Sequence, residues 1–131
     1  MRGLLAVLML LPPCALAAGE GAWQASAVGL TLSHRGQSAS SAPLASPQPV
    51  SGLVTAVAWR YTLNGPTPAG LRVRLCSQTR CTELDGQSGI TWALRDTPAA
   101  EPLRFVWEVP GGGRLIPALN VSSNQIIVNY R

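Results

Sequence analysis

The stretch Leu71–Leu84, LRVRLCSQTRCTEL, predicts a β-hairpin that is closed by a disulfide bond. Its first half alternates apolar residues with arginines, which is the period of a strand with one buried face and one wet face. A four-residue loop at Ser77–Arg80 allows Cys76 to lie opposite Cys81. We therefore expect these two cysteines to be cross-linked, with a pair of free thiols or half of a metal site as the alternative.

One register of this hairpin satisfies every cross-strand pair at once. The pairs that it brings together are Arg74 with Glu83, Arg72 with Asp85, and Val73 with Leu84. A slip of one residue would break all of them, because side chains change face at each step along a strand. The cross-link closes a very short loop, so its entropic contribution is only about 2 kcal/mol and its main effect is to fix the register.

The N-terminus has the layout of a secretory signal peptide. Arg2 precedes the apolar run Leu4–Leu11, and Ala15-Leu16-Ala17 supplies the small residues of a cleavage site. The apolar run is too short to span a bilayer as an ordinary transmembrane helix. We expect residues 1–17 to be removed, and Cys14 with them. The three cysteines of the chain thereby become two, which supports the disulfide and an oxidising compartment.

Composition favours one small all-β domain over residues 18–131. The mature chain would carry nine arginines, no lysine and six acidic residues, since Arg2 leaves with the signal peptide and ten minus one is nine. This net charge of about +3 is too small for a nucleic-acid-binding protein without a recognition motif. Short apolar runs between Gly, Pro, Ser and Thr predict an antiparallel β-sandwich, with an immunoglobulin-like fold or a small barrel as alternatives.

The expected strands alternate apolar and polar residues between turn signals. Trp23–Leu32 forms one or two strands, with Val28, Leu30 and Leu32 on one face and a bulge near Gly29. Val54–Leu63 is the longest and central strand, and Ile90–Leu94 and Leu103–Val109 are two further strands. The chain ends in a hairpin that pairs Leu115–Val121 with Gln125–Tyr130 across Ser122–Asn124. Residues 37–51, rich in Ser, Ala and Pro, predict either a crossing at a sheet edge or a floppy linker.

The chain offers little for catalysis. His34 is the only histidine, so no site with two imidazole ligands can form, and no Gly-x-Ser-x-Gly motif is present. We therefore expect a protein that is not an enzyme, holds no cofactor or metal and has no small-molecule substrate. Trp59 and Trp107 alternate with charged residues as core residues do, whereas Trp23 and Trp92 leave open a carbohydrate- or peptidoglycan-binding module.

Several motifs follow one another across essentially the whole mature chain: Ala18–Ser26 (AGEGAWQAS), Val57–Tyr61 (VAWRY), Gly65–Pro68 (GPTP), Leu71–Gln78 (LRVRLCSQ), Trp107–Leu119 (WEVPGGGRLIPAL) and the ending Val128–Arg131 (VNYR). In this order they closely resemble the bacterial flagellar protein FlhE family. The resemblance implies a periplasmic accessory protein of flagellar assembly, acting as a chaperone of rod subunits or as a regulator of proton leakage at the export gate. It implies flagellar rod or gate proteins as partners. From the small net charge and the short N-terminal apolar run we expect neither nucleic acid as a partner nor a stable membrane anchor.

We place the partner contact on the segment Pro110–Pro117, at Gly111, Gly112, Gly113 and Arg114, beside Arg72 and Arg74 of the hairpin. Three glycines inside an otherwise regular strand pair would let another backbone approach closely. The alternative is that the glycines form a bulge that bends the sheet.

Overall fold

A computed structural model describes residues 21–131, and the expected signal peptide lies outside them. The described chain is all β and contains no helix, so no helix in it could cross a membrane. Nine strands form two antiparallel sheets: β1 (Gly21–Val28), β2 (Thr31–His34), β3 (Ser38–Ser40), β4 (Val54–Leu63), β5 (Arg72–Cys76), β6 (Cys81–Leu84), β7 (Ser88–Thr91), β8 (Arg104–Glu108) and β9 (Arg114–Tyr130).

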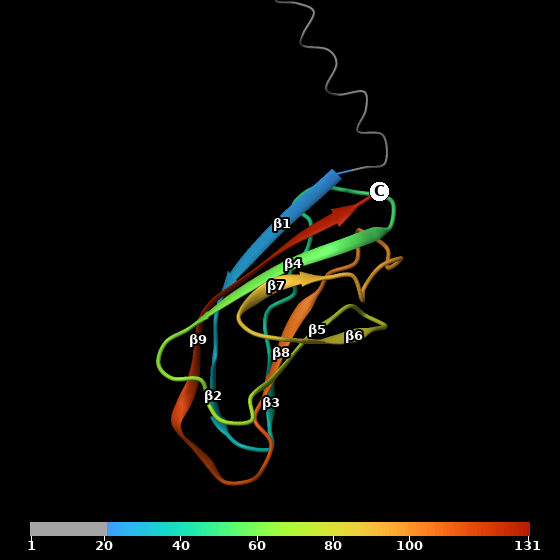
Figure 1. Cartoon of the computed structure of the whole chain (residues 1–131). Coiled ribbons are helices and arrows are strands. Elements are labelled where there is room, and N and C mark those ends of the chain that lie inside the picture. Colours follow the sequence, from blue (N-terminus) through green and yellow to red (C-terminus); the bar gives the residue numbers. More distant parts are fainter. Residues whose placement is uncertain (1–20) are drawn as a thin grey trace, which may run out of the picture.

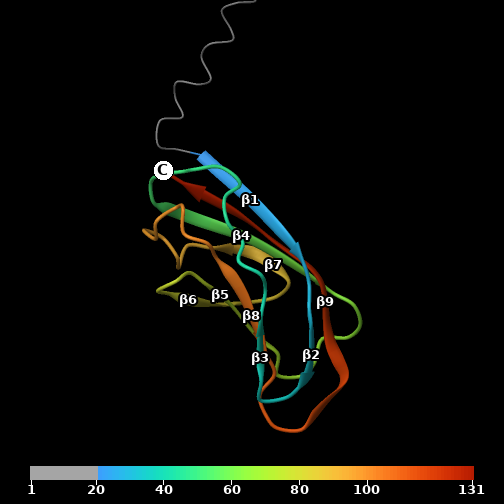
Figure 2. The same ribbon diagram turned by 180° about the vertical axis from the view of Figure 1, so that it is seen from behind.

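The two sheets pack face to face as a sandwich, as predicted. The first has the order β1-β9-β4-β7 with β2 also on β9, and the second has the order β3-β8-β5-β6. Figure 1 shows β1, β9 and β4 side by side in one layer, and Figure 2 shows β3, β8 and β5 in the other. Because β3 occupies a sheet edge, the Ser/Ala/Pro-rich region 37–51 is a sheet-edge crossing, and Leu44 extends it through a bridge to Leu103.

An aromatic cluster joins the two sheets across the core. Tyr61 of β4 meets the rings of Phe105 and Trp107 of β8 edge-on, with centroids 6.0 Å and 5.8 Å apart. Phe105 and Trp107 stack on each other at 5.4 Å. The alternation predicted for this strand is confirmed, since Leu103, Phe105, Trp107 and Val109 are all buried. Such pairs add stability beyond the area that they bury.

The predicted final hairpin is wrong, because β9 is one strand of 17 residues that passes straight through Ser122–Asn124. Its pairing with the N-terminal strands keeps one register, from Val28 opposite Ser123 to Thr31 opposite Asn120. On its other side β9 pairs with β4, which is therefore central as predicted but not the longest strand. Ser and Asn, which lie near the middle of β9, are residue types that are common in turns. Only the pairing of β9 with distant strands shows that the chain does not turn there.

The bulge expected near Gly29 is absent from the pairing of β1 and β2 with β9, which keeps one register there; the register shift lies on the other side of β9, between Thr62 and Leu63 of β4. Trp23 and Leu32 are both buried although they stand at odd and even positions, so the side-chain alternation changes phase between β1 and β2. Val28, expected to face inward with Leu32, is 84% exposed, and that part of the prediction is wrong. The short strand expected at 90–94 is β7, which begins at Ser88 and ends at Thr91.

Candidate functional site

The predicted partner-binding residues belong to two different elements of the fold. Arg72 and Arg74 stand on the outer face of the second sheet, in β5, whereas Gly111–Arg114 connects β8 of the second sheet to β9 of the first. The glycine run therefore does not lie inside a regular strand pair, and that premise of the sequence argument is wrong. It forms a crossing loop between the two sheets.

The hairpin has the predicted register and disulfide. Cys76 is opposite and bonded to Cys81, Arg74 is opposite Glu83, and Val73 is opposite Leu84. The ion pairs differ from the prediction, because β6 ends at Leu84 and the chain then turns toward β7. Arg72 consequently bonds Glu83 diagonally instead of Asp85.

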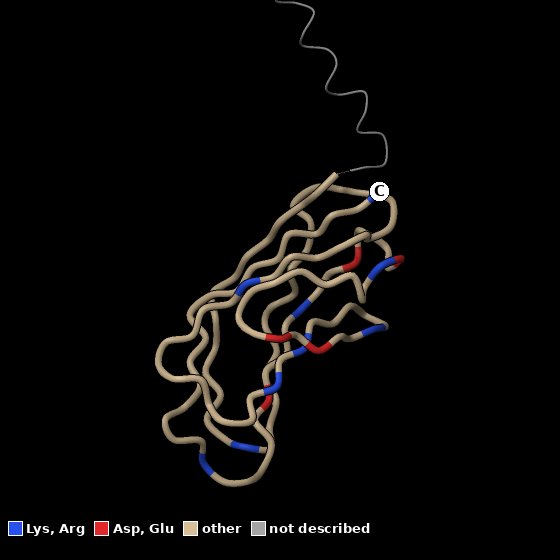
Figure 3. The backbone as a smooth tube through the Cα atoms, viewed as in Figure 1, with Lys and Arg blue, Asp and Glu red and all other residues tan. Residues whose placement is uncertain are grey.

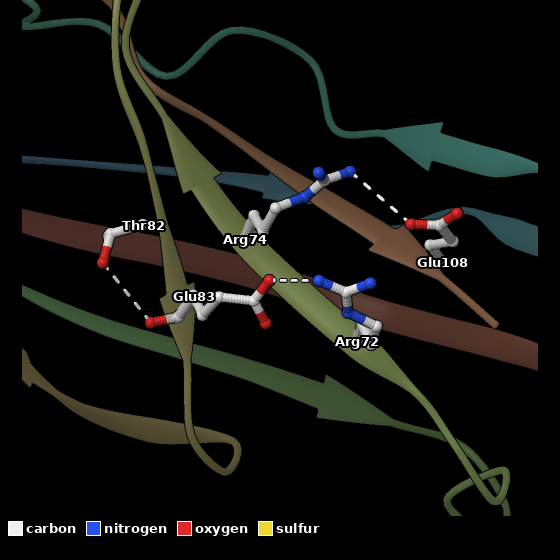
Figure 4. A network of polar contacts seen from close by, with 5 residues as sticks. All are labelled: Arg72, Arg74, Thr82, Glu83 and Glu108. Atoms are coloured by element: carbon white, nitrogen blue, oxygen red, sulfur yellow. Dashed lines mark hydrogen bonds and ion pairs between the residues drawn. The ribbon is translucent and has the colours of Figure 1, made fainter. Parts of the chain in front are cut away.

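Both hairpin arginines are engaged with carboxylates (Figure 4). Arg72 Nη2 lies 2.6 Å from Glu83 Oε2, and Arg74 Nη2 lies 3.7 Å from Glu108 Oε1. The hydrogen bond to Glu83, followed by its charge, raises the pKa of Arg72. These cations already have partners within the chain, so they are weaker candidates for attracting an acidic partner than the sequence suggested.

The crossing loop is held by the turn between β2 and β3. Arg35 donates its backbone N–H to Gly113 O at 2.8 Å, and Gly36 donates to Val109 O at 2.8 Å. Gly111 and Gly113 adopt φ angles of 117° and 85°, which side chains disfavour. Gly112 has no such angle, and a Cβ there would meet nothing within 4 Å. Two of the three glycines are therefore needed for the loop conformation itself.

A groove of about 190 Å³ lies at this end of the sandwich, which is the lower end in Figure 1. Its lining, called here the loop-end groove, comes from the β2–β3 turn, the β4–β5 connection and the start of β9: Arg35, Pro66, Thr67, Pro68, Ala69, Leu115, Ile116 and Pro117. Ile116 is 80% exposed, although its neighbour Leu115 is 3% exposed and belongs to the core. The segment Pro110–Pro117 thus contributes one wall of a real groove.

The rim of this groove is positively charged. Arg35 lines it, and Arg114 is the residue before Leu115, which also lines it. Figure 3 shows positively charged positions, in blue, at this lower end of the molecule. Among residues 21–131, neither arginine forms an ion pair. Glu108, which precedes the crossing loop, is bound to Arg74. Both positive charges are therefore available to a partner.

The segment Pro110–Pro117, named from the sequence, includes three residues of the groove lining, but Arg35 and residues 66–69 were missed. Ile116 stands in the apolar run Leu115–Leu119 and was taken as part of an ordinary strand. Pro117 was the residue that could have indicated an exposed strand edge. Proline has no N–H to donate, so inside a sheet it is found mainly on edge strands, where no hydrogen bond is lost. Nothing local in the sequence indicates that Arg35 or residues 66–69 meet this edge.

The four tryptophans separate into a buried and an exposed group. Trp23, Trp59 and Trp107 are buried, and the indole N–H groups of Trp23 and Trp59 bond Ala99 O at 2.9 Å and Gly86 O at 3.4 Å. Trp92 alone is exposed, at 59%. A carbohydrate platform would therefore depend on a single ring.

A second and larger groove, of about 450 Å³, opens between the two sheets. Tyr61 lines it together with apolar residues of β5 and β6, and Asp85 is its one charged residue. Burial raises the pKa of Tyr61. In the part of the chain that the structure describes, no group of three or more His, Cys, Asp and Glu side chains could hold a metal ion. A single carboxylate beside a tyrosine gives no paired acid and base.

Comparisons with known proteins agree on one family. A family model described as "Flagellar protein FlhE" matches residues 29–131. Proteins named "Flagellar protein FlhE" are 73% identical in Salmonella typhimurium over 124 residues, covering 95% of both chains, and 70% identical in Escherichia coli over 131 residues, covering 100% of both. A solved structure described as "Crystal Structure of FLHE" is similar with a TM-score of 0.85 and 75% identity, covering 87% of this chain and 99% of the other.

Proposed function

The chain belongs to the flagellar protein FlhE family, and from this we propose that it is exported to the periplasm and assists flagellar assembly by binding another flagellar protein. It acts through its surface and performs no catalysis. The partner is a rod subunit that it protects before assembly, or a protein of the export gate whose proton leakage it limits.

The observation that carries a binding function is the loop-end groove. It exposes the large apolar side chain of Ile116 beside two arginines that form no ion pair in residues 21–131. An apolar centre with a polar rim is the composition of a protein interface. A chaperone or a gate regulator would use such a surface to cover part of its partner.

The disulfide supports the proposed location. Cys76 and Cys81 are bonded in a hairpin at the surface, where Cys81 is exposed. Disulfides of this kind persist in oxidising compartments and are rare in the cytosol. The N-terminal signal pattern in residues 1–17 agrees with this location.

Cell fractionation and motility test the proposal together. The native protein should appear in the periplasmic fraction, with a mass that lacks residues 1–17 and contains no free thiol. Cells carrying Arg114→Ala and Gly112→Ala together should show reduced motility, with the far-ultraviolet circular dichroism of the purified variant unchanged. Arg104→Ala is the matched control, because Arg104 is also exposed and without an ion pair but lies in β8. A cytoplasmic protein, or full motility of the double variant, would overturn the proposal.

A further inference from the structure

The start of β9 has one free edge. On one side, residues 114–120 pair with β2, from His34 opposite Arg114 to Thr31 opposite Asn120. On the other side, the pairing with β4 ends at Leu63 opposite Val121, and the hydrogen bond from Asn64 N to Asn120 O is the last one. Beyond it the β4–β5 connection moves aside and leaves the loop-end groove.

Pro117 makes this edge unsuitable for adding a regular strand. It has no N–H to donate, and proline on an edge is a known protection against strand pairing. A segment lying in the groove would therefore be held mainly through its side chains.

The apolar part of the groove is preformed. Prolines 66, 68 and 117 limit the backbone freedom of both walls, and Leu71 N bonds Pro68 O at 3.3 Å. Ile116, at 80% exposure, stands out of the wall instead of filling it. A bulky apolar side chain can pack against this residue without the ordering cost that a flexible loop would add.

The positive charge at the groove favours a partner segment that carries a negative charge. Arg35 lines the groove, Arg114 comes directly before its lining residue Leu115 in β9, and no acidic residue lines it. The stem of Arg35 lies against Gly111, where a Cβ would be 3.4 Å from Arg35 Cδ, so this arginine is positioned by the crossing loop. A carboxylate is the partner group that guanidinium binds with the best geometry.

We propose that the loop-end groove binds an extended segment of a partner protein in which an acidic residue lies within two positions of a bulky apolar residue. The apolar side chain packs on Ile116 and the prolines, and the carboxylate pairs with Arg35 and Arg114. This inference rests on the proposed function, because it describes the segment through which the flagellar partner would be recognised.

Other ligand classes fit the groove less well. Sugars bind on aromatic faces, and no aromatic residue lines it. A nucleic acid or polyphosphate would meet two cations but would cover Ile116 and three prolines with polar groups. A protein segment alone satisfies both the apolar and the charged part.

The test places a photo-crosslinking amino acid at position 116 of the full chain in cells that are building flagella. The crosslinked segment is then sequenced by mass spectrometry. The matched control carries the same amino acid at position 28, because Val28 is 84% exposed but lies seven positions of β9 away, opposite Ser123. We expect one predominant segment from position 116, with Asp or Glu next to a large apolar residue, and not from position 28.

Substitutions check that both parts of the groove contribute. With the crosslinker at Thr67 on the opposite wall, Arg35→Ala with Arg114→Ala, and separately Ile116→Ser, should each reduce the yield about tenfold. Arg104→Ala and Val28→Ser should leave it unchanged. Equal yields in all variants, equal capture at position 28, or a captured segment that is basic or purely polar would overturn the inference.

The outcomes separate this inference from the proposed function. An acidic and apolar segment of a protein unrelated to flagella would support the groove chemistry and overturn the flagellar role. A flagellar protein captured through a basic segment would support the role and overturn the groove chemistry.

Discussion

At the scale of single residues, glycines decide where segments can meet. A Cβ atom on Gly29 would lie 1.5 Å from the backbone oxygen of Val121, so any side chain would push β9 away. Gly29 instead bonds Ser122 O at 3.1 Å, at the point where the core alternation changes phase. The glycine in the strand pattern does mark a close approach of two backbones, but the bulge predicted from it is not present in the register of β1 and β2 with β9.

The crossing loop provides a matched pair of glycines. Gly111→Ala should lower the free energy of unfolding by about 1–3 kcal/mol, because alanine is strained at a φ of 117°. Gly112→Ala should change it by less than about 0.5 kcal/mol, since the site is open. Urea denaturation of both variants measures the difference. Equal stabilities would mean that the loop conformation does not depend on its glycines.

Tyr61 gives the protein a dependence on alkaline pH. Burial raises its pKa above the ordinary 10.0, so the folded state holds the phenol proton more tightly than the unfolded chain does. Its contribution to stability is complete below pH 10.0 and is lost as the pH rises through the folded pKa. Tyr61→Phe should therefore flatten the fall of the urea midpoint between about pH 9 and about pH 11. An unchanged slope would contradict this assignment.

At the scale of elements, local sequence patterns were sufficient to predict pairing and burial where the paired strands follow each other in the sequence. The hairpin register followed from alternation and from the two cysteines, and the inward face of β8 followed from alternation alone. The Arg72 ion pair was wrong because the ending of β6 depends on the crossing to β7. The final hairpin was wrong because the partners of β9 lie about 60 to 109 residues earlier in the chain.

The candidate site was predictable only in part, for the same reason. Arg114 and the glycine run lie in one continuous motif, so they were found. Arg35 and residues 66–69 come from two connections that meet the start of β9 only after the strands have assembled. No periodicity within a single segment carries that information.

The disulfide should matter for the hairpin more than for the whole fold. Cys76→Ala with Cys81→Ala should reduce the free energy of unfolding by about 2 kcal/mol, since the closed loop is short. The turn keeps other support, because Ser77 Oγ accepts hydrogen bonds from Thr79 and Arg80. Chemical denaturation measures the loss, and hydrogen exchange should show it mainly in β5 and β6. Complete unfolding of the double variant would show that the whole fold, and not mainly the hairpin, depends on the disulfide.

At the scale of the whole molecule, the two sheets depend on one core. Arg80, carried by the hairpin turn, donates to Ala93 O at 3.1 Å and to Arg95 O at 2.8 Å, and thus ties the second sheet to the loop that follows β7. The aromatic cluster of Tyr61, Phe105 and Trp107 joins the sheets from inside. We therefore expect the sandwich to unfold as one unit.

Phe105 tests this cooperativity. Phe105→Ala should cost about 3–5 kcal/mol, because the side chain is fully buried, and both sheets should lose hydrogen-exchange protection together. Val28→Ala is the control, with a change of less than about 0.5 kcal/mol at an exposed position. Loss of protection in the second sheet alone would show that the layers are independent.

The unbroken course of β9 determines when the protein can fold at all. Among the described strands β9 comes last in chain order, yet β1, β2 and β4 all pair with it. These three strands therefore lack their common neighbour until the chain has reached β9, and such distant pairings form slowly. The first sheet can therefore be completed only after β9 has been made, whereas every strand of the second sheet precedes it.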